Sequence, residues 1–414
     1  MTINTVIDLT RRPVPRPVEV SVVMPCLDEE ESVGLCVARA LEGIRRSGLV
    51  GEVVVCDNGS TDRSVIVATQ AGARVVHQPQ RGYGSAYRKG FEYARGHFLV
   101  MGDSDGSYDF AELHQLTARL QAGESDYVLG SRFAGEILPG AMPWLHQRIG
   151  NPVLTGILNR FFGLRVSDAH SGMRAFTREA YDQLGLATEG MEFASEIVIN
   201  AAQAGLKVSE VPITYHPRIG ESKLHSFRDG WRHLRFMLLL APKYLFMIPG
   251  VLLMTFGLTG QLFLLPGNAA VGSQRLGLHF VVLATLMTVL GYMTLMFGVF
   301  TKAYARLRKS TYTDGTLHWL DRHFSLERGL VAGVGTFAVG FVVDAYLLVD
   351  WLSRNQGEYD ALRPALLALT LMMVGAMTAF GSFFLSLFFD PSTRKAGRAV
   401  LAERTAGAKA DATR

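Results

Sequence analysis

Residues 99–107 read Leu-Val-Met-Gly-Asp-Ser-Asp-Gly-Ser, an apolar run that ends abruptly in two acidic residues. Because side chains alternate along an extended strand, Asp103 and Asp105 are expected to share a face where the strand leaves its sheet. Two carboxylates that converge there form an oxygen site suited to Mg²⁺ or Mn²⁺, ions that also bind substrate phosphates. A polar turn after a buried strand is the alternative, and the rest of the chain decides between the two.

Strands and helices are predicted to alternate on both sides of this stretch. The expected strands are Val18–Met24, Glu52–Cys56, Arg74–His77, Phe98–Met101 and Asp126–Gly130. This alternation predicts a largely parallel α/β sheet with helices on both faces. Ligands bind at the carboxyl ends of the strands in such sheets. The acid-rich loops 25–30, 57–62 and 103–107 all follow such ends, so we expect them to meet at one edge.

Charge and hydrophobicity are unevenly distributed over the 414 residues. Residues 1–235 carry most of the charge, whereas 236–390 contain long, nearly uncharged runs, which predicts an α/β domain (18–225) followed by an all-α transmembrane domain. The net charge of +4 is too small and too dispersed to indicate a nucleic-acid partner. The three cysteines lack metal-ligand spacing and are interpreted as buried free thiols in a reducing compartment. Residues 1–17 contain no signal-peptide core and are expected to be flexible.

Four segments within 244–390 are long and apolar enough to cross a bilayer, and we expect them to interact with membrane lipids. They are 244–265, 278–300, 329–351 and 365–389. Lys and Arg are concentrated in loop 302–328 and in the basic tail 391–414, which is expected to be flexible. The positive-inside rule therefore predicts a multi-pass plasma-membrane protein with both termini and the first domain in the cytoplasm.

Two amphipathic segments are candidates for contact with the bilayer surface. Residues 226–243 combine basic residues with Trp231 and are expected to form a juxtamembrane helix in the headgroup layer. Residues 149–164 fit either the same role or a helix packed on the sheet. Asp344 lies inside the third span, where an ionisable group is costly, and is interpreted as a packing partner for polar groups of other helices.

Nine motifs occur in collinear order and carry a family resemblance. The first four are Pro-Cys-Leu-Asp-Glu-Glu (25–30), Val-Cys-Asp-Asn-Gly-Ser-Thr-Asp (55–62), Arg-Gly-Tyr-Gly-Ser-Ala (81–86) and Gly-Asp-Ser-Asp-Gly (102–106). The others are Gly-Ser-Arg (130–132), Asp-Ala-His-Ser-Gly-Met-Arg (168–174), Met-Glu-Phe-Ala-Ser-Glu (191–196), Gly-Glu-Ser-Lys-Leu (220–224) and Arg-Asp-Gly-Trp-Arg-His-Leu-Arg-Phe (228–236). The first set resembles family 2 glycosyltransferases with the nucleotide-sugar-binding GT-A fold. The second resembles the polyprenyl-phosphate (dolichyl-phosphate) glucose and mannose synthase group. Asp28 stands where these enzymes often have Asn, and Asn58 where many have a second Asp.

The resemblance implies an inverting, metal-dependent transfer of a hexose from a nucleotide sugar to a polyprenyl phosphate. Asp103 and Asp105 would ligate Mg²⁺ or Mn²⁺ on the donor diphosphate, with Ser107 as a third ligand, directly or through water. The residues implied to bind the donor are Pro25, Leu27, Glu29, Asp57, Gly82, Gly84, Lys89 and Ser104. Packing at a strand end would explain Pro25 and Leu27 equally well, and Lys89 fits a solvated helix position.

The acceptor, whether undecaprenyl, decaprenyl or dolichyl phosphate, presents an anionic head group that the arginine fork matches. Arg132 follows a strand end beside the metal loop and is the first candidate for this contact. Ser131, Arg148, Arg174 and Lys223 are implied by family position, and a surface charge is the alternative for each basic residue. A phosphate monoester is already ionised at neutral pH, so the reaction requires no carboxylate base.

Several functional hypotheses stay open. UDP-glucose is the preferred donor, because segments 168–174 and 228–236 resemble the glucose synthase branch, and GDP-mannose is the second choice. A processive polysaccharide synthase is opposed by the absence of a Gln-x-x-Arg-Trp motif. A non-enzymatic module that flips a lipid carrier is a further alternative, and the sequence leaves homo-oligomerisation open.

Overall fold

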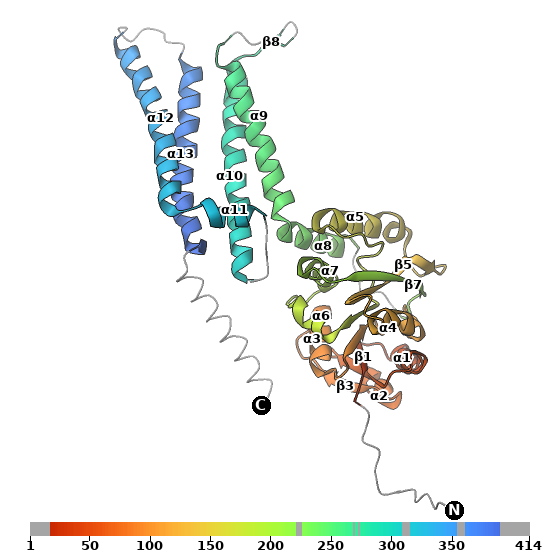
Figure 1. Cartoon of the computed structure of the whole chain (residues 1–414). Helices are drawn as coiled ribbons and strands as arrows, with labels where there is room; N and C mark the ends of the chain where they lie inside the picture. Colours follow the sequence, from red (N-terminus) through yellow and green to blue (C-terminus); the bar gives the residue numbers. More distant parts are fainter. Residues whose placement is uncertain are drawn as a thin grey trace, which may run out of the picture. The chain divides into compact units, whose positions relative to one another are not determined.

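The computed structural model describes residues 17–220, 226–267, 270–271, 274–308, 315–353 and 361–389 (Figure 1). The chain forms two compact units, Met1–Met237 and Leu238–Arg414. The expectations for residues 1–16, for Lys223 and for the tail 391–414 lie outside the described residues.

A seven-stranded sheet with the order β3-β2-β1-β4-β6-β5-β7 forms the centre of the first unit. Its strands are β1 Val20–Cys26, β2 Gly51–Asp57, β3 Arg74–His77, β4 Phe98–Met101, β5 Tyr127–Ile137, β6 Arg174–Thr177 and β7 Val208–Tyr215. Strands β3, β2, β1 and β4 are mutually parallel, β6 runs antiparallel to β4 and β5, and β7 is parallel to β5. The predicted α/β class with a mostly parallel sheet is confirmed, and β6 and β7 extend it beyond the strands expected from sequence.

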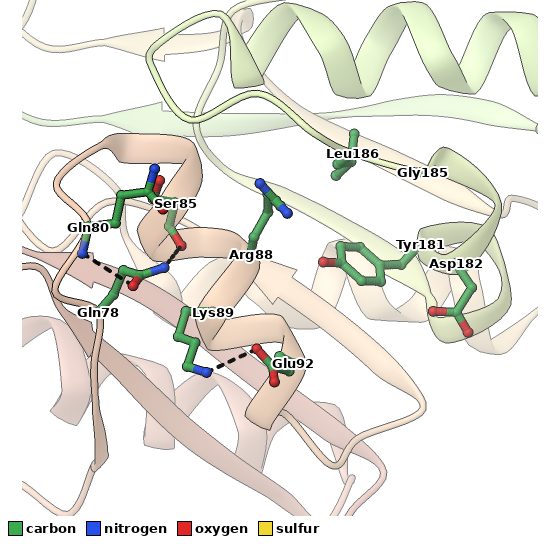
Figure 2. Close-up of a pocket in the computed structure, with 10 residues that line it drawn as sticks. All are labelled: Gln78, Gln80, Ser85, Arg88, Lys89, Glu92, Tyr181, Asp182, Gly185 and Leu186. Atoms are coloured by element: carbon green, nitrogen blue, oxygen red, sulfur yellow. Dashed lines mark hydrogen bonds and ion pairs between the residues drawn. The ribbon is translucent and has the colours of Figure 1, made fainter. Parts of the chain in front are cut away.

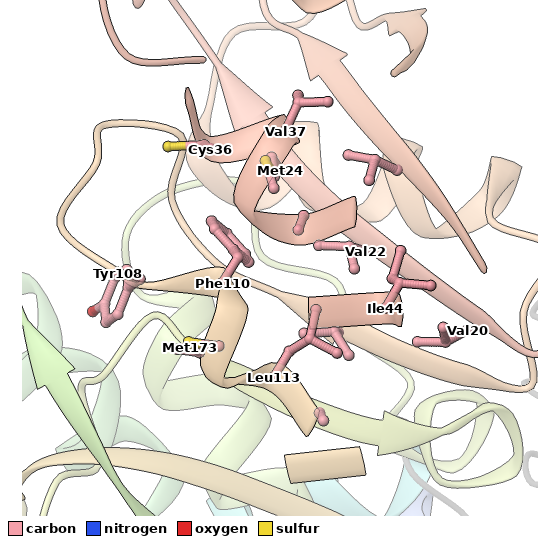
Figure 3. Packing of buried hydrophobic residues seen from close by; sticks show 14 of the residues in the cluster. Val20, Val22, Met24, Cys36, Val37, Ile44, Tyr108, Phe110, Leu113 and Met173 are labelled. Atoms are coloured by element: carbon pink, nitrogen blue, oxygen red, sulfur yellow. The ribbon is translucent and has the colours of Figure 1, made fainter. Parts of the chain in front are cut away.

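Helices cover both faces of this sheet. The helical elements of this unit are α1 Val33–Ser47, α2 Ser64–Gln70, α3 Tyr83–Tyr93, η1 Phe110–Glu112, α4 Leu113–Gln121, the π-helix η2 His146–Gly150, α5 Asn151–Phe162, α6 Arg178–Leu184 and α7 Phe193–Ala204, and α8 Ser226–Leu240 spans the boundary to the second unit. Val22 of β1 belongs to a buried cluster with Val37 of α1 and Leu113 of α4 (Figure 3). Val23 points to the other face, where a Cβ on Gly90 of α3 would lie 2.4 Å from its Cγ1. The alternation of β1 therefore separates α1 and α4 from α3.

The carboxyl ends of β1, β2 and β4 lie at one edge, because the three strands are adjacent and parallel. Side chains fasten the loops that follow them. The Ser104 hydroxyl donates to the Pro25 carbonyl at 2.6 Å, and the Ser32 hydroxyl donates to the Ser104 carbonyl at 2.8 Å. The Asp28 carboxylate accepts from the Thr61 amide at 2.7 Å. The three acid-rich loops thus meet at one edge of the sheet, as the strand pattern predicts.

An ionic cluster around the buried Glu52 fastens the end of α3 to the start of the sheet. Glu52 of β2 accepts from the Ser21 hydroxyl at 2.9 Å and forms ion pairs with Arg95 at 2.7 Å and Arg74 at 3.0 Å. The Ser21 hydroxyl also accepts from the Gly96 amide at 2.8 Å. Burial raises the pKa of Glu52, but Arg95, Ser21 and Arg74 outweigh it and hold the pKa at about 2.

In the described part of the second unit, four helices are long and apolar enough to cross a membrane. The helical elements are the π-helix η3 Lys243–Met247, α9 Ile248–Leu264, α10 Leu278–Arg308, α11 Gly315–His323, α12 Leu326–Ser353 and α13 Leu362–Phe389, with a short hairpin of β8 Ala270–Val271 and β9 Gln274–Arg275. The candidate spans are Lys243–Leu264, Leu278–Arg306, Leu326–Ser353 and Leu362–Phe389.

Small residues allow these helices to approach closely. A Cβ on Gly257 of α9 would lie 2.4 Å from the Thr288 amide nitrogen of α10, and one on Gly333 of α12 would lie 2.5 Å from that of Ala379 of α13. Such small-residue contacts are typical of helix pairs in membranes. Asp344 departs from the expectation of a packing role, because it is exposed on α12 and has no hydrogen bond or ion pair within the described part of the chain.

Replacing Glu52 by Gln is expected to lower the free energy of unfolding by about 1–3 kcal/mol at neutral pH. Because the folded-state pKa is depressed, this contribution is present above the unfolded pKa of about 4.3 and is lost as the pH falls toward the folded pKa. Urea unfolding at a series of pH values tests this. The wild type should lose more stability between neutral and acidic pH than E52Q, and identical pH dependence would contradict the prediction.

Candidate active site

Asp103 lies directly after β4 and is held by two tyrosines of α3. The Tyr83 and Tyr87 hydroxyls donate to its Oδ1 at 2.9 and 3.2 Å. Burial and the neighbouring Asp105 raise the pKa of Asp103, while the two hydroxyls act in the opposite direction. Burial also raises the pKa of both tyrosines well above the usual value, so they remain donors at neutral pH. The i, i+4 spacing of the tyrosines gives them a common face of α3, a signal that the sequence analysis overlooked.

Asp105 is the second carboxylate of the site, and an arginine from beyond β7 approaches it. Its Oδ1 accepts from the Ser107 amide at 3.0 Å and from the Ser107 hydroxyl. Its Oδ2 lies 3.3 Å from Nη1 of Arg218, whose Nη2 donates to Glu29. The Arg218 Nε is buried and has no hydrogen-bond partner among the described residues. Arg218 was not among the residues expected from sequence, and only its position just before the 220–224 motif could have pointed to it.

The carboxylates fit an open site for a divalent cation. Among the described residues, no group of three or more His, Cys, Asp or Glu side chains could enclose a metal. Mg²⁺ is commonly bound by only one or two carboxylates, with waters and substrate phosphates completing its coordination. A Cβ on Gly172 would lie 2.7 Å from Oδ2 of Asp103, so a larger residue there would crowd this oxygen. Asp103, Asp105 and the adjacent Ser107 therefore suit an ion that arrives with a diphosphate.

Arg132 and Arg174 are engaged by the protein itself. Arg132 forms a buried bidentate pair with Asp168, at 2.7 Å from Nε and 2.8 Å from Nη2, and its guanidinium lies 5.0 Å from the centre of the Tyr215 ring. Arg174 is fully buried and donates to three main-chain carbonyl groups. The expectation that both present their guanidinium groups to an acceptor phosphate therefore disagrees with the geometry. Both stabilise the 168–174 loop instead.

The remaining acceptor candidates differ in accessibility. Ser131 is fully buried, and its hydroxyl lies 2.6 Å from that of Ser167, so it is not placed to contact an acceptor. Arg148 lies in η2 and is exposed, close in sequence to Trp144, which is 67% exposed. Arg148 is thus the accessible cation among the predicted acceptor residues that the structure describes.

Asp57 and Asn58 organise the loop after β2. Asp57 is buried, and its carboxylate accepts from the Ser60 amide at 3.1 Å and pairs with His77 at 2.8 Å. Asn58 donates to the carbonyls of Gln78 and Gln80, a role that a carboxylate cannot fill. The departure from the family pattern at Asn58 thus has a local structural reason. Pro25 and Leu27 lie half-buried at the same edge.

The glycines of the 81–86 motif are required by packing within the protein. A Cβ on Gly82 would lie 2.3 Å from the Glu189 carbonyl oxygen, and one on Gly84 would lie 2.4 Å from that of Thr188. The φ angle of Gly82 is +150°, in the region that favours glycine. Glu196 of α7 anchors this facing loop by accepting from the Thr188 amide at 2.9 Å. Both glycines are predicted to bind the donor, whereas in the structure the space beside each Cα is filled by the 187–189 loop.

Lys89 lies away from the carboxylates. Its Nζ pairs with Glu92 at 3.2 Å, and it lines a separate pocket of about 370 Å³ with Gln78 and Tyr181 (Figure 2). At 100° per residue, Lys89 lies on the opposite side of α3 from Tyr87. The geometry therefore gives no support to the expected contact of Lys89 with the donor.

Comparisons with known proteins show which family the chain resembles. Residues 21–185 match glycosyl transferase family 2, and residues 299–388 match the glycosyltransferase family 2 C-terminal transmembrane region. The chain is 40% identical over 365 residues to the low-salt glycan biosynthesis hexosyltransferase Agl6 of Haloferax volcanii, covering 88% of each protein. It is 34% identical over 214 residues to the dolichyl-phosphate hexose transferase of that organism, covering 51% of this chain and 89% of the relative. The crystal structure of glucosyl-3-phosphoglycerate synthase from Mycobacterium tuberculosis with phosphoglyceric acid gives a TM-score of 0.43 at 23% identity, covering 54% of this chain and 80% of that one.

An acid-lined edge on a mostly parallel sheet, followed by apolar helices, defines a membrane-associated glycosyltransferase with a GT-A-like fold. The chain belongs to glycosyltransferase family 2, and it is a hexosyltransferase related to the dolichyl-phosphate hexose transferases. The predicted family, fold class and enzyme class are therefore confirmed.

Replacing both Tyr83 and Tyr87 by Phe is expected to weaken binding of Mn²⁺ about tenfold, since two charge-assisted hydrogen bonds to Asp103 are lost. The hydroxyls lower the pKa of Asp103, so their removal raises it further and lets protons compete with the metal at higher pH. Calorimetric titration with Mn²⁺ in the presence of a nucleoside diphosphate, repeated at several pH values, measures both effects. Tyr181→Phe is the matched control, and an unchanged pH profile in the double variant would count against this role.

Proposed function

We propose that this chain transfers a hexose from a nucleotide sugar to a polyprenyl phosphate, with inversion, on the cytoplasmic side of the membrane. The observation that carries the proposal is the pair of carboxylates after β4, with the Arg218 guanidinium between Asp105 and Glu29. The arrangement offers both a cation site and a fixed positive charge to a diphosphate. The name of the dolichyl-phosphate hexose transferase supports a lipid phosphate as the acceptor.

Asp103 and Asp105 would hold Mg²⁺ or Mn²⁺, with Ser107 beside them, and the bound ion would neutralise charge on the leaving nucleoside diphosphate. The protein supplies the rest of the chemistry by positioning. Tyr83 and Tyr87 fix the Asp103 carboxylate, and Glu29 holds the Arg218 guanidinium, whose buried Nε has a hydrogen bond still to give. We assign Arg218 to the diphosphate oxygens, because guanidinium groups pair well with phosphate.

The transfer step needs no carboxylate base. An ionised oxygen of the acceptor phosphate forms a bond to the anomeric carbon, and the bond from that carbon to the diphosphate oxygen breaks with its electron pair. Attack from the face opposite the leaving group inverts the configuration. Because the acceptor has a second pKa of about 6, its nucleophilic oxygen is already deprotonated at neutral pH. Rate acceleration then rests on alignment and charge neutralisation.

Arg148 is the residue we assign to the acceptor phosphate, since it is exposed while Arg132 is bound to Asp168. The Arg132–Asp168 pair is given a positioning role, because it joins the middle of β5 to the 168–174 loop. Removing either member of such a buried pair leaves an uncompensated charge. Loss of activity in an Arg132 variant would therefore not identify an acceptor contact.

The proposals for the donor sugar and for the side of the membrane are based on the sequence. UDP-glucose is our preferred donor and GDP-mannose the alternative, because of the branch resemblance of segments 168–174 and 228–236. The concentration of Lys and Arg in loop 302–328 supports a cytoplasmic catalytic unit. Membership of a hexosyltransferase family leaves no place for a purely non-enzymatic role. A processive synthase would differ in its product, which is a polymer rather than a single glycosylated lipid.

Replacing Asp103 or Asp105 by Asn is expected to reduce transfer by about a hundredfold or more, because charge on the leaving group is no longer neutralised. Excess chelator should stop the wild type, and Mg²⁺ or Mn²⁺ should restore it. Asp182→Asn, an exposed carboxylate on α6, is the matched control. Transfer of radiolabelled hexose to undecaprenyl phosphate measures the rates, and full activity in excess chelator would refute the metal assignment.

Replacing Arg148 by Ala is expected to raise the KM for undecaprenyl phosphate about tenfold or more and to leave the KM for the nucleotide sugar unchanged. The exposed Arg165, which follows α5 and lies outside the helices and strands, provides the control substitution. Assays with UDP-glucose and GDP-mannose, followed by chromatography, identify the sugar and separate a single lipid product from a polymer. Efficient glycosylation of free polyprenol would show that a catalytic base exists and would overturn the proposed mechanism.

A further inference from the structure

The second unit contains a pocket of about 480 Å³ at one end of the α9–α10 pair. Four apolar side chains from η3 and the first turns of α9 form one wall: Met247, Ile248, Val251 and Leu252. Val251 and Leu252 are 50% and 51% exposed, so this wall is open. Because the wall belongs to the first candidate span, its natural neighbour is hydrocarbon rather than water.

The other side of the pocket is cationic and polar. Lys302 lies near the end of α10 and is only 3% exposed, and its Nζ donates to the Thr316 hydroxyl at 2.8 Å. Lys243 opens the first candidate span and is exposed. Gly315 and Thr316 line the pocket with the first residues of α11, a nine-residue helix whose amino end favours anions. One pocket thus combines an apolar wall, two ammonium groups and a helix amino end.

We infer that this pocket binds the acceptor lipid itself, with the phosphate monoester between Lys243 and Lys302 and the first isoprene units along the apolar wall. The identity of the lipid rests on the proposed function. A phosphate monoester carries up to two negative charges near neutral pH, which matches two lysines better than the single charge of a bilayer phosphodiester. The pocket would retain the acceptor lipid in the membrane unit, as a site separate from the phosphate contact assigned to Arg148.

Chain connectivity places this pocket at the end of the first span where the chain enters the membrane unit. Lys243 follows closely after Met237, the last residue of the first unit, and Lys302 lies near the end of the antiparallel α10. Both lysines therefore belong to the end of the α9–α10 pair at which the chain arrives from the catalytic unit. A lipid phosphate held there lies in the cytoplasmic leaflet of the proposed topology.

The test uses the full-length protein in phosphatidylcholine nanodiscs that contain either undecaprenyl phosphate or phosphatidylglycerol. Native mass spectrometry after partial delipidation counts the lipid molecules that each variant retains. The Lys243→Gln, Lys302→Gln double variant is expected to retain undecaprenyl phosphate about tenfold less than the wild type. Lys302→Arg keeps the charge and should keep the lipid, and Arg322→Gln on α11 removes a charge outside the pocket and should have no effect.

The outcomes distinguish a failure of the lipid-pocket inference from a failure of the proposed function. Unchanged retention of undecaprenyl phosphate in the double variant would overturn the inference, as would equal retention of phosphatidylglycerol by the wild type. Lipid retention is also measured in Asp103→Asn, where the pocket should bind as in the wild type although transfer is lost. Failure of the wild type to glycosylate undecaprenyl phosphate would speak against the proposed function alone. An unchanged melting temperature in the double variant and retention by Lys302→Arg exclude misfolding as the cause of lipid loss.

Discussion

Two carboxylates held next to each other at the end of β4 are the constraint on which the first unit depends. Asp103 is half-buried, and desolvation together with the like charge of Asp105 raises its pKa. Such a pair is tolerable only if each oxygen is stabilised, and the structure does this with groups from distant parts of the chain. Tyrosine hydroxyls come from α3, an arginine from beyond β7, and a serine from the same loop. The fold therefore brings separate segments to this edge to hold the two carboxylates in place.

The sequence predicted the edge of the site better than its interior. Acidic loops after parallel strands meet by topology, so Asp57, Asp103 and Asp105 could be placed from the strand pattern alone. Tyr83 and Tyr87 could have been predicted as partners of an acidic residue, because their i, i+4 spacing places them on one face of a helix. Arg218 could not have been predicted, because its partner Glu29 lies 189 positions away and no local sequence pattern links them.

The predicted acceptor residues show what a sequence motif does not reveal, namely which side chains bind each other. Arg132 and Asp168 both lie in family motifs, but the motif does not say that they bind each other across 36 positions. A buried arginine and an exposed one look identical in sequence, and only packing separates Arg132 and Arg174 from Arg148. The short strand β6 escaped prediction for a related reason. Its four residues pair antiparallel with β4 and β5, and such a strand needs its neighbours to be recognised.

Contact between the 81–86 segment and the 187–189 loop has a consequence for how the chain can be recombined with its relatives. Gly82 and Gly84 leave no room for a Cβ beside the carbonyls of Glu189 and Thr188, and Glu196 fixes those carbonyls from α7. The two segments thus behave as one module, although about a hundred positions separate them in the chain. A chimera that exchanges the first segment without the second brings together two surfaces whose side chains and backbone do not pack well. Recombination among relatives should therefore preserve the two segments together. The two segments are expected to be exchanged as a pair, because a tertiary contact joins them.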